Sequence, residues 1–145
     1  MSIELRHIHK HYDNLVIYRD FSLALPDKTI SCILGPSGCG KTSLLNMIGG
    51  ITPQNKGKIE GVENKKISFI FQEPRLLPWK TVRGNLEFVL RHQTSHDKEQ
   101  AIDNNLLLVG LQDFAQYYPE QLSGGMKQRV AIARAFSYPS DLILM

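Results

Sequence analysis

The pattern of apolar and polar positions predicts several short strands in the first half of the chain. Residues 3–12 are strand-like, and two apolar runs flank a turn signal at residues 26–28, which indicates a hairpin or another tight connection. The second run, residues 29–34, is rich in Ile, Cys and Leu, as expected of a buried strand. Residues 56–62 predict a short edge strand, and residues 66–71 predict another buried strand.

Helix signals alternate with these strands. Lys41 begins a segment of helical character, and Gly49 and Gly50 form its stop signal. Further helices are predicted after residues that can cap a helix N-terminus. These caps are Thr81, Ser95 and Ser123, and the helices that follow them cover residues 82–91, 97–110 and 124–136.

The last residues predict one more strand. Pro139 is a helix-breaking signal after the last predicted helix, and the segment 141–145 that follows is mainly apolar. Because strands alternate with helices, the expected fold class is α/β with a largely parallel sheet.

Composition and charge narrow the functional class only slightly. The 145 residues allow one domain with a sizeable core, and the net charge of +3 is compatible with a nucleotide or an anionic surface but does not demand a nucleic acid. No apolar run approaches the ~18 residues of a membrane span, and the N-terminus lacks the apolar region of a secretory signal. Two Cys residues are too few for a disulfide framework, so we expect a reducing, cytoplasmic setting and membrane association only through a partner protein.

The stretch GPSGCGKTS, residues 35–43, is the first chemical motif. It fits the pattern G-x-x-x-x-G-K-[ST] and lies between a predicted strand and a predicted helix, as a phosphate-binding loop requires. Its glycines bring backbone N–H groups close to phosphate oxygens, and the helix N-terminus adds partial positive charge. We therefore predict that it binds a nucleoside triphosphate. The residues concerned are Gly35, Pro36, Ser37, Gly38, Cys39, Gly40, Lys41, Thr42 and Ser43.

Three side chains of this loop have distinct expected roles. Lys41 supplies a full charge to the β- and γ-phosphates, and the Thr42 hydroxyl binds Mg²⁺. Cys39 has two interpretations: the helix N-terminus favours its reactive thiolate, or it is only a small residue that fits the loop.

The stretch QLSGGMKQRVAIARAF, residues 121–136, is the second motif. Ser123, Gly124 and Gly125 open a helix and expose backbone N–H groups, so they form either an anion site or an ordinary capped helix start. Together with the phosphate loop, the stretch resembles the ATP-binding subunits of ABC transporters, where L-S-G-G-Q, a basic residue, Gln-Arg and an Ala-rich helix follow the loop. Here Met126 stands where Gln is commonest.

The resemblance runs over the whole chain and implies a P-loop NTPase fold. That fold has a mostly parallel sheet, N-terminal antiparallel β-strands and a helical subdomain that carries the LSGG segment. Residues 1–145 would then comprise an ATP-binding core over 1–71, a mostly helical subdomain over 72–122, and the signature helix with the start of the Walker B strand over 123–145. The family continues with an Asp, a catalytic Glu and a switch His. We therefore expect a C-terminal part beyond these residues, and little hydrolysis by this chain alone.

The resemblance also implies roles for single residues. Tyr12 corresponds to the aromatic residue that stacks on adenine, although a core or surface Tyr is the alternative. Gln72 corresponds to the residue that reaches Mg²⁺ and the attacking water. The segment after Gln72 corresponds to the contact with the membrane-spanning subunits, where Trp79 and Leu76–Leu77 either make that contact or pack in the ordinary way.

In the resembling family two subunits pair head to tail, and each ATP lies between the phosphate loop of one and the LSGG segment of the other. This implies that Ser123, Gly124 and Gly125 contact the γ-phosphate bound by the partner copy. Thr42 and Gln72 would hold Mg²⁺. The residues with implied catalytic roles are Lys41, Gln72, Ser123 and Gly125.

The stretches FQEPRLLPW and LSGGM look most like those of importers for nitrate, sulfonates, taurine and related small molecules. The implied activity is ATP hydrolysis coupled to solute uptake at the cytoplasmic face of the cell membrane. The implied partners are a second copy of the chain, permease subunits and, indirectly, a periplasmic or extracellular solute-binding protein, but no nucleic acid. The alternatives are a soluble ABC-type ATPase of DNA repair or translation and a nucleotide-binding module without hydrolysis.

His7, His9 and His11 alternate along the first predicted strand, so they are expected to share one face. We expect that face to be solvated, because a structural zinc site usually needs four ligands at recognised spacings.

Overall fold

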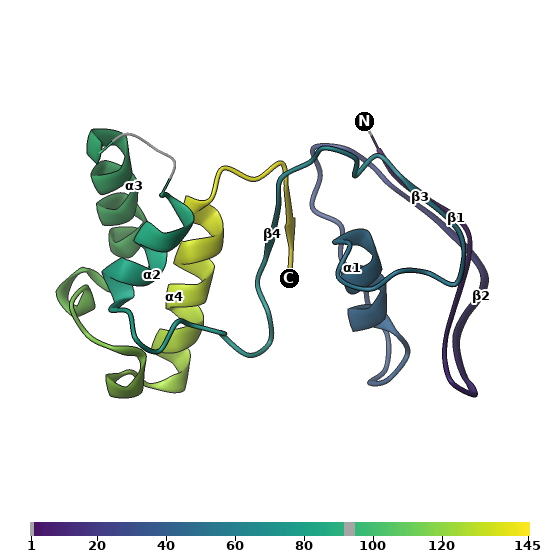
Figure 1. Ribbon diagram of the computed structural model, residues 1–145, viewed down its shortest axis with the longest axis horizontal. Coiled ribbons are helices and arrows are strands. Elements are labelled where there is room, and N and C mark those ends of the chain that lie inside the picture. The colour runs from purple at the N-terminus through teal and green to yellow at the C-terminus, as the bar shows by residue number, and fades with distance from the viewer. Residues whose placement is uncertain (1, 92–94) are drawn as a thin grey trace. The chain divides into compact units, whose positions relative to one another are not determined.

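The structure is a computed structural model that describes residues 2–91 and 95–145, apart from the side chains of residues 95 and 96. The chain forms two compact units, which divide between Lys65 and Lys66 (Figure 1). The three-part division of residues 1–145 expected from the sequence stays a prediction.

An antiparallel sheet forms much of the first unit. β1 (Ile3–Tyr12) is its central strand, with β2 (Leu15–Leu25) on one side and β3 (Lys56–Glu60) on the other. The predicted first strand and the predicted edge strand are therefore confirmed. α1 (Lys41–Ile48) follows the glycine-rich loop, as predicted, and buries Leu44, Met47 and Ile48.

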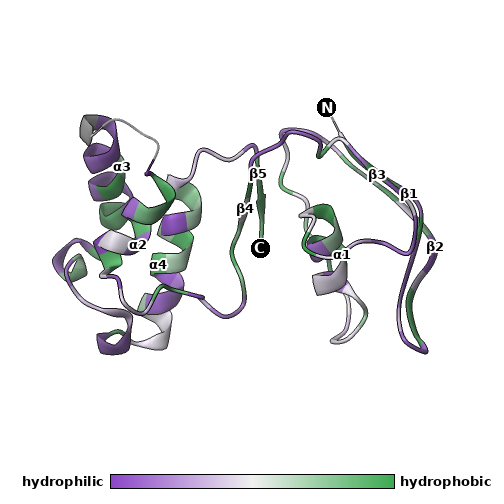
Figure 2. Ribbon diagram, viewed as in Figure 1, coloured by the Kyte–Doolittle hydropathy of each residue, from purple (hydrophilic) through white to green (hydrophobic). Residues whose placement is uncertain are grey.

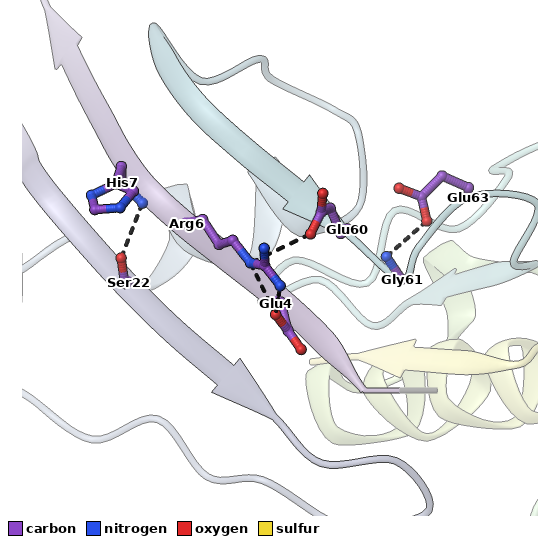
Figure 3. Close-up of polar contacts among 7 residues, drawn as sticks. All are labelled: Glu4, Arg6, His7, Ser22, Glu60, Gly61 and Glu63. Atoms are coloured by element: carbon purple, nitrogen blue, oxygen red, sulfur yellow. Dashed lines mark hydrogen bonds and ion pairs between the residues drawn. The ribbon is translucent and has the colours of Figure 1, made fainter.

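A β-bulge in β1 changes which residues face the core. Leu5 is buried before the bulge and Ile8 after it, so the alternation shifts by one position. His7 lies in the bulge with a φ of 51°, and its backbone N–H donates to Ser22 Oγ at 3.0 Å (Figure 3). The three histidines alternate with the buried Ile8 and Lys10, as predicted for side chains on the opposite face; His7 and His11 are exposed and His9 is half-buried. The described residues contain no cluster of His, Cys, Asp or Glu that could hold a metal ion.

Exposed ion pairs lie along the same strand. Arg6 Nε donates to Glu4 Oε2 at 3.0 Å and lies 3.4 Å from Glu60 Oε2 on β3 (Figure 3). Because exposed ion pairs contribute little to stability, the register of this sheet depends mainly on its buried apolar residues.

Residues 29–34 do not form the predicted buried strand. Ile30 and Leu34 are 96% and 90% exposed, and β2 ends at Leu25 without a returning strand. The apolar pattern is compatible with a strand, but a strand also needs a hydrogen-bonded neighbour. Among the described residues, no strand pairs with this segment.

The second unit combines a parallel strand pair with packed helices. β4 (Ile67–Phe69) pairs in parallel with β5 (Leu142–Leu144), which confirms both predicted strands. Figure 2 shows both strands as hydrophobic. The helical segments are α2 (Val82–Val89), α3 (Ser95–Leu108), η1 (Gln112–Phe114), η2 (Pro119–Gln121) and α4 (Gly124–Ser137). In the described ranges, none of the helices is both long enough and apolar enough to span a membrane.

Helix α4 packs against α2 and α3 around one apolar cluster. Because the cluster draws on all three helices and on the turns before α4, it sets the position at which α4 begins. Its buried members are Val82, Leu86, Leu90, Ile102, Leu106, Leu111, Leu122, Val130 and Ala133.

The caps of α2 and α4 are those that the sequence predicts. Thr81 Oγ1 accepts a hydrogen bond from the Gly84 N–H at 3.1 Å, and Ser123 Oγ accepts one from the Met126 N–H at 3.3 Å. The predicted cap at Ser95 involves a side chain outside the described residues.

Candidate functional site

The glycine-rich loop turns tightly into the N-terminus of α1. Gly38 and Gly40 have φ values of 81° and 101°, a region that side chains disfavour. A Cβ at Gly40 would lie 2.6 Å from Ile17 Cγ2 and 3.0 Å from Tyr18 Oη, so the loop packs closely on β2. Only a glycine fits this position without strain.

Helix α1 begins without a side-chain cap among the described residues. Its N-cap is Gly40, and its first turn contains no acidic side chain. The first N–H groups of a helix have no intrahelical partner, so here they remain available to an anion. The local sequence thus leaves a set of hydrogen-bond donors for a ligand.

Lys41 adds a full positive charge to the loop. Its Nζ donates to the Gly35 and Pro36 carbonyls at 2.8 and 2.7 Å, which folds the side chain back over the loop. The Cys39 Sγ lies 3.7 Å from the same Nζ and is exposed, and the reactivity of its thiol stays a prediction. Amide donors and an ammonium group together suit the oxygens of a triphosphate.

Tyr12 lies beside the first turn of α1. A hydrogen bond with the Ser43 side chain lowers the pKa of its phenol, against the opposing effect of burial. The Lys10 Nζ lies 4.5 Å from the centre of the Tyr12 ring and donates to the Pro53 carbonyl at 2.7 Å. The ring is therefore held near the phosphate loop and remains 44% exposed, so a planar base has access to it. Its stacking on adenine stays a prediction.

Thr42 and Gln72 are the expected Mg²⁺ ligands, and both are exposed. Hydroxyl and amide oxygens are donors that suit this hard cation. Gln72 follows β4 in the second unit, whereas Thr42 belongs to the first unit. Their joint binding of one ion stays a prediction.

The LSGG segment begins α4. Ser123 caps the helix, and Gly124 and Gly125 are exposed, with open space where a Cβ would stand. Met126, which stands where Gln is commonest in the resembling family, packs against the apolar cluster of the second unit. The backbone N–H groups of this helix start are thus accessible, while the following side chain anchors it.

The segment after Gln72 contains one strongly exposed aromatic residue. Trp79 is 70% exposed, whereas Leu76 packs against the apolar cluster. The backbone N–H and carbonyl of Leu77 both form hydrogen bonds with the Asn85 side chain. The sequence motifs did not identify Asn85 as a functional residue. An Asn among the apolar positions of α2 is the sequence signal that could have indicated it.

The chain matches the family model described as ABC transporter over residues 18–145. It is 38% identical over 143 residues to an aliphatic sulfonates import ATP-binding protein of Pseudomonas syringae pv. tomato, a match that covers 98% of this chain and 60% of the relative. It is 36% identical over 141 residues to a nitrate import ATP-binding protein of Synechococcus elongatus, covering 90% of this chain and 51% of that protein. The chain thus spans only part of the length of these curated relatives.

The fold is also similar to a solved structure. The dimeric structure of MJ0796, a bacterial ABC transporter cassette, has a TM-score of 0.87 and 28% identity, covering 97% of this chain and 72% of that one. A dimeric post-hydrolysis state of the same cassette bound to ADP and phosphate has a TM-score of 0.84 and 26% identity, with the same coverage. The expected α/β P-loop NTPase fold is confirmed.

Proposed function

Because the chain belongs to the ABC transporter family, we propose that it forms the ATP-binding part of an importer ATPase, whose hydrolysis of ATP drives uptake of a small solute. The observation that carries this proposal is the uncapped start of α1 beside the Lys41 ammonium, a combination suited to a triphosphate. The names of the relatives, which are import proteins for sulfonates and nitrate, favour a solute of that kind, such as nitrate, a sulfonate or taurine.

In this proposal, different residues bind the phosphates, the adenine base and the metal ion. The amides of residues 35–43 and Lys41 bind the phosphates, and the Tyr12 ring stacks on the adenine. Thr42 and Gln72 would hold Mg²⁺, which neutralises charge on the phosphates when bound. Gln72 also orients the attacking water. Lys41 and the amides therefore provide most of the affinity, and Gln72 acts on the chemical step.

Dimerisation completes the site in this proposal. The exposed amides of Ser123, Gly124 and Gly125 bind the γ-phosphate held by a second copy, so that the nucleotide bridges two chains. The dimeric state of the neighbours supports pairing of two copies. The permease subunits contact the segment after Gln72, where Trp79 is exposed, at the cytoplasmic face of the membrane. A solute-binding protein acts only indirectly.

Titration with a fluorescent ATP analogue tests the proposal. We expect saturable, Mg²⁺-dependent binding that ATP competes away. Lys41→Ala should weaken it by about tenfold or more, since a hydrogen bond to a charged group contributes on the order of 1.5–3 kcal/mol. Lys58→Ala is a matched control, because Lys58 is an exposed lysine of the same unit, on β3. Binding that is absent in the native chain, or equal in Lys41→Ala and native protein, would overturn the proposal.

A further inference from the structure

Side chains of α4 hold the backbone on both sides of Gln72. Gln128 Nε2 donates to the Phe71 carbonyl at 3.3 Å. Arg134 Nη2 donates to the Pro74 carbonyl at 3.1 Å, and its Nη1 donates to the Arg75 carbonyl at 3.0 Å. The helix that begins with the LSGG segment is therefore bound directly to the segment that carries Gln72.

Asn85 of α2 completes this network from the other side. It is fully buried, and its Oδ1 accepts hydrogen bonds from the Leu77 N–H at 2.9 Å and from Arg134 Nη1 at 3.4 Å. Its Nδ2 donates to the Leu77 carbonyl at 3.2 Å and to the Lys80 and Thr81 carbonyls. A buried amide with both ends satisfied holds its partners in one arrangement.

The segment held in this way has an unfavourable backbone conformation. Arg75 has a φ of 45°, which is uncommon for a residue with a side chain and persists only where the surroundings impose it. Its guanidinium lies 3.9 Å from the centre of the Phe71 ring, so the segment also folds back on itself. The carbonyl of this same residue accepts a hydrogen bond from Arg134.

The charged guanidinium of Arg134 is partly shielded from solvent. Burial lowers the pKa of its guanidinium. A buried charge costs stability unless hydrogen bonds compensate it, and here three acceptors on two other segments do so. The planar fork of an Arg can bind two adjacent carbonyls, whereas a Lys ammonium has no such fork.

We propose that Arg134 is a positioning residue, which together with Asn85 and Gln128 clamps residues 71–77 to α4. The clamp fixes the position of Gln72 relative to the Ser123–Gly125 helix start, so that a displacement of one displaces the other. Its effect on nucleotide binding rests on the proposed function, whereas its effect on residues 71–77 does not.

Hydrogen exchange without nucleotide tests the clamp itself. In Arg134→Gln and Arg134→Lys, amides of residues 73–80 should exchange about tenfold faster, the change expected when a hydrogen bond to a charged group is lost. The anisotropy of Trp79, the only tryptophan of the sequence, should fall in parallel. Arg129→Gln is the matched control, because Arg129 lies on the same helix and donates to the Val109 carbonyl at 2.9 Å, outside this segment. Unchanged exchange in both Arg134 variants, or an equal change in Arg129→Gln, would overturn the proposal.

A milder substitution, Gln128→Met, keeps the proposal testable if the Arg134 variants do not fold. Gln128→Met removes the donor to the Phe71 carbonyl and keeps a side chain of similar length. Exchange in residues 70–73 should rise in this variant, while the circular dichroism spectrum stays that of the native chain. If Arg134→Gln fails to fold, an unchanged exchange rate in Gln128→Met contradicts the clamp.

Nucleotide affinity tests the link to Gln72. The ratio of affinity with Mg²⁺ to affinity with a chelator isolates the contribution of the metal. We expect Arg134→Lys and Gln72→Ala each to lower this ratio several-fold, and the double variant to lower it no further than either single variant. The affinity with chelator should remain native, which a general structural defect would not allow. Additive effects of the two substitutions, or a native Mg²⁺-to-chelator affinity ratio in Arg134→Lys, would overturn the link between Arg134 and Gln72. If the native protein binds no nucleotide, only the proposed function fails, and the hydrogen-exchange experiment then decides whether the clamp exists.

Discussion

The starts of α1 and α4 both present backbone N–H groups at glycines, but they are built differently. The N-cap of α1 is Gly40 in a left-handed conformation, and no described side chain caps it. The N-cap of α4 is Ser123, whose hydroxyl accepts the Met126 N–H. The start of α1 thus leaves its donors to a ligand and adds Lys41, whereas α4 is stabilised by its own side chain. We infer that α1 provides most of the phosphate affinity and α4 a second, weaker contact.

Alanine at the glycines of the two helix starts should give opposite effects, and this is the largest difference that we expect. Gly40→Ala combines a φ of 101° with a close contact to Ile17 and should destabilise the fold by roughly 1–3 kcal/mol. Gly125→Ala meets no neighbour and should raise stability by up to about 1 kcal/mol, because Ala favours a helix. Thermal unfolding followed by circular dichroism compares them. Changes of the same sign would contradict the contrast between the two helix starts.

Tyr12 sharpens the same contrast, because it adds a stacking surface beside α1. Tyr12→Ala should weaken nucleotide binding by about fivefold to 100-fold, since stacking of a base on an aromatic ring contributes on the order of 1–3 kcal/mol. Tyr12→Phe keeps the ring and removes the phenol hydroxyl with its hydrogen bonds, of which the one with Ser43 has the largest effect on the phenol pKa, so its affinity should stay near native. Isothermal titration with Mg-ATP measures both. An affinity of Tyr12→Phe as low as that of Tyr12→Ala would exclude stacking as the role of the ring.

Removing the cap of α4 should have a moderate effect on stability. Ser123→Ala leaves the Met126 N–H without its acceptor and should cost about 1 kcal/mol, while Ser123→Asp should restore most of it. Urea unfolding monitored by Trp79 fluorescence provides the measurement. A native stability for Ser123→Ala would mean that α4, like α1, does not depend on a side-chain cap.

Met126→Gln should have the smallest effect. Met126 is only partly buried against the apolar cluster, so its replacement by a polar side chain of similar length should cost less than the about 1 kcal/mol expected for loss of the Ser123 cap. A loss well beyond that range, measured by the same urea unfolding, would show that Met126 is essential to the packing of α4.

Local sequence signals predicted much of the helical structure. Thr81 and Ser123 were recognisable as caps because a short polar side chain before a helix can bond to the first free N–H groups, and the structure has both bonds. Residues 141–145 were recognisable as a strand from a short apolar run after Pro139, and β5 lies there. These features depend on residues close together in the chain.

Two features that depend on partners distant along the chain were not predicted correctly from local sequence. Residues 29–34 have the composition of a buried strand, yet Ile30 and Leu34 are exposed and no described strand pairs with them. The bulge at His7 depends on the register between β1 and β2, which alternation along one strand does not reveal.

The sequence by itself determined the phosphate-loop motif, the two helix starts and the family, because the chemistry of each depends on neighbouring residues whose order is enough to recognise them. Only the tertiary structure revealed the hydrogen bonds from Arg134 and Asn85 to the residues after Gln72. These partners are far apart along the chain, and an arginine or asparagine has the same local appearance whether it faces water or binds a distant backbone. Folding alone brings such donors and carbonyls within hydrogen-bonding distance.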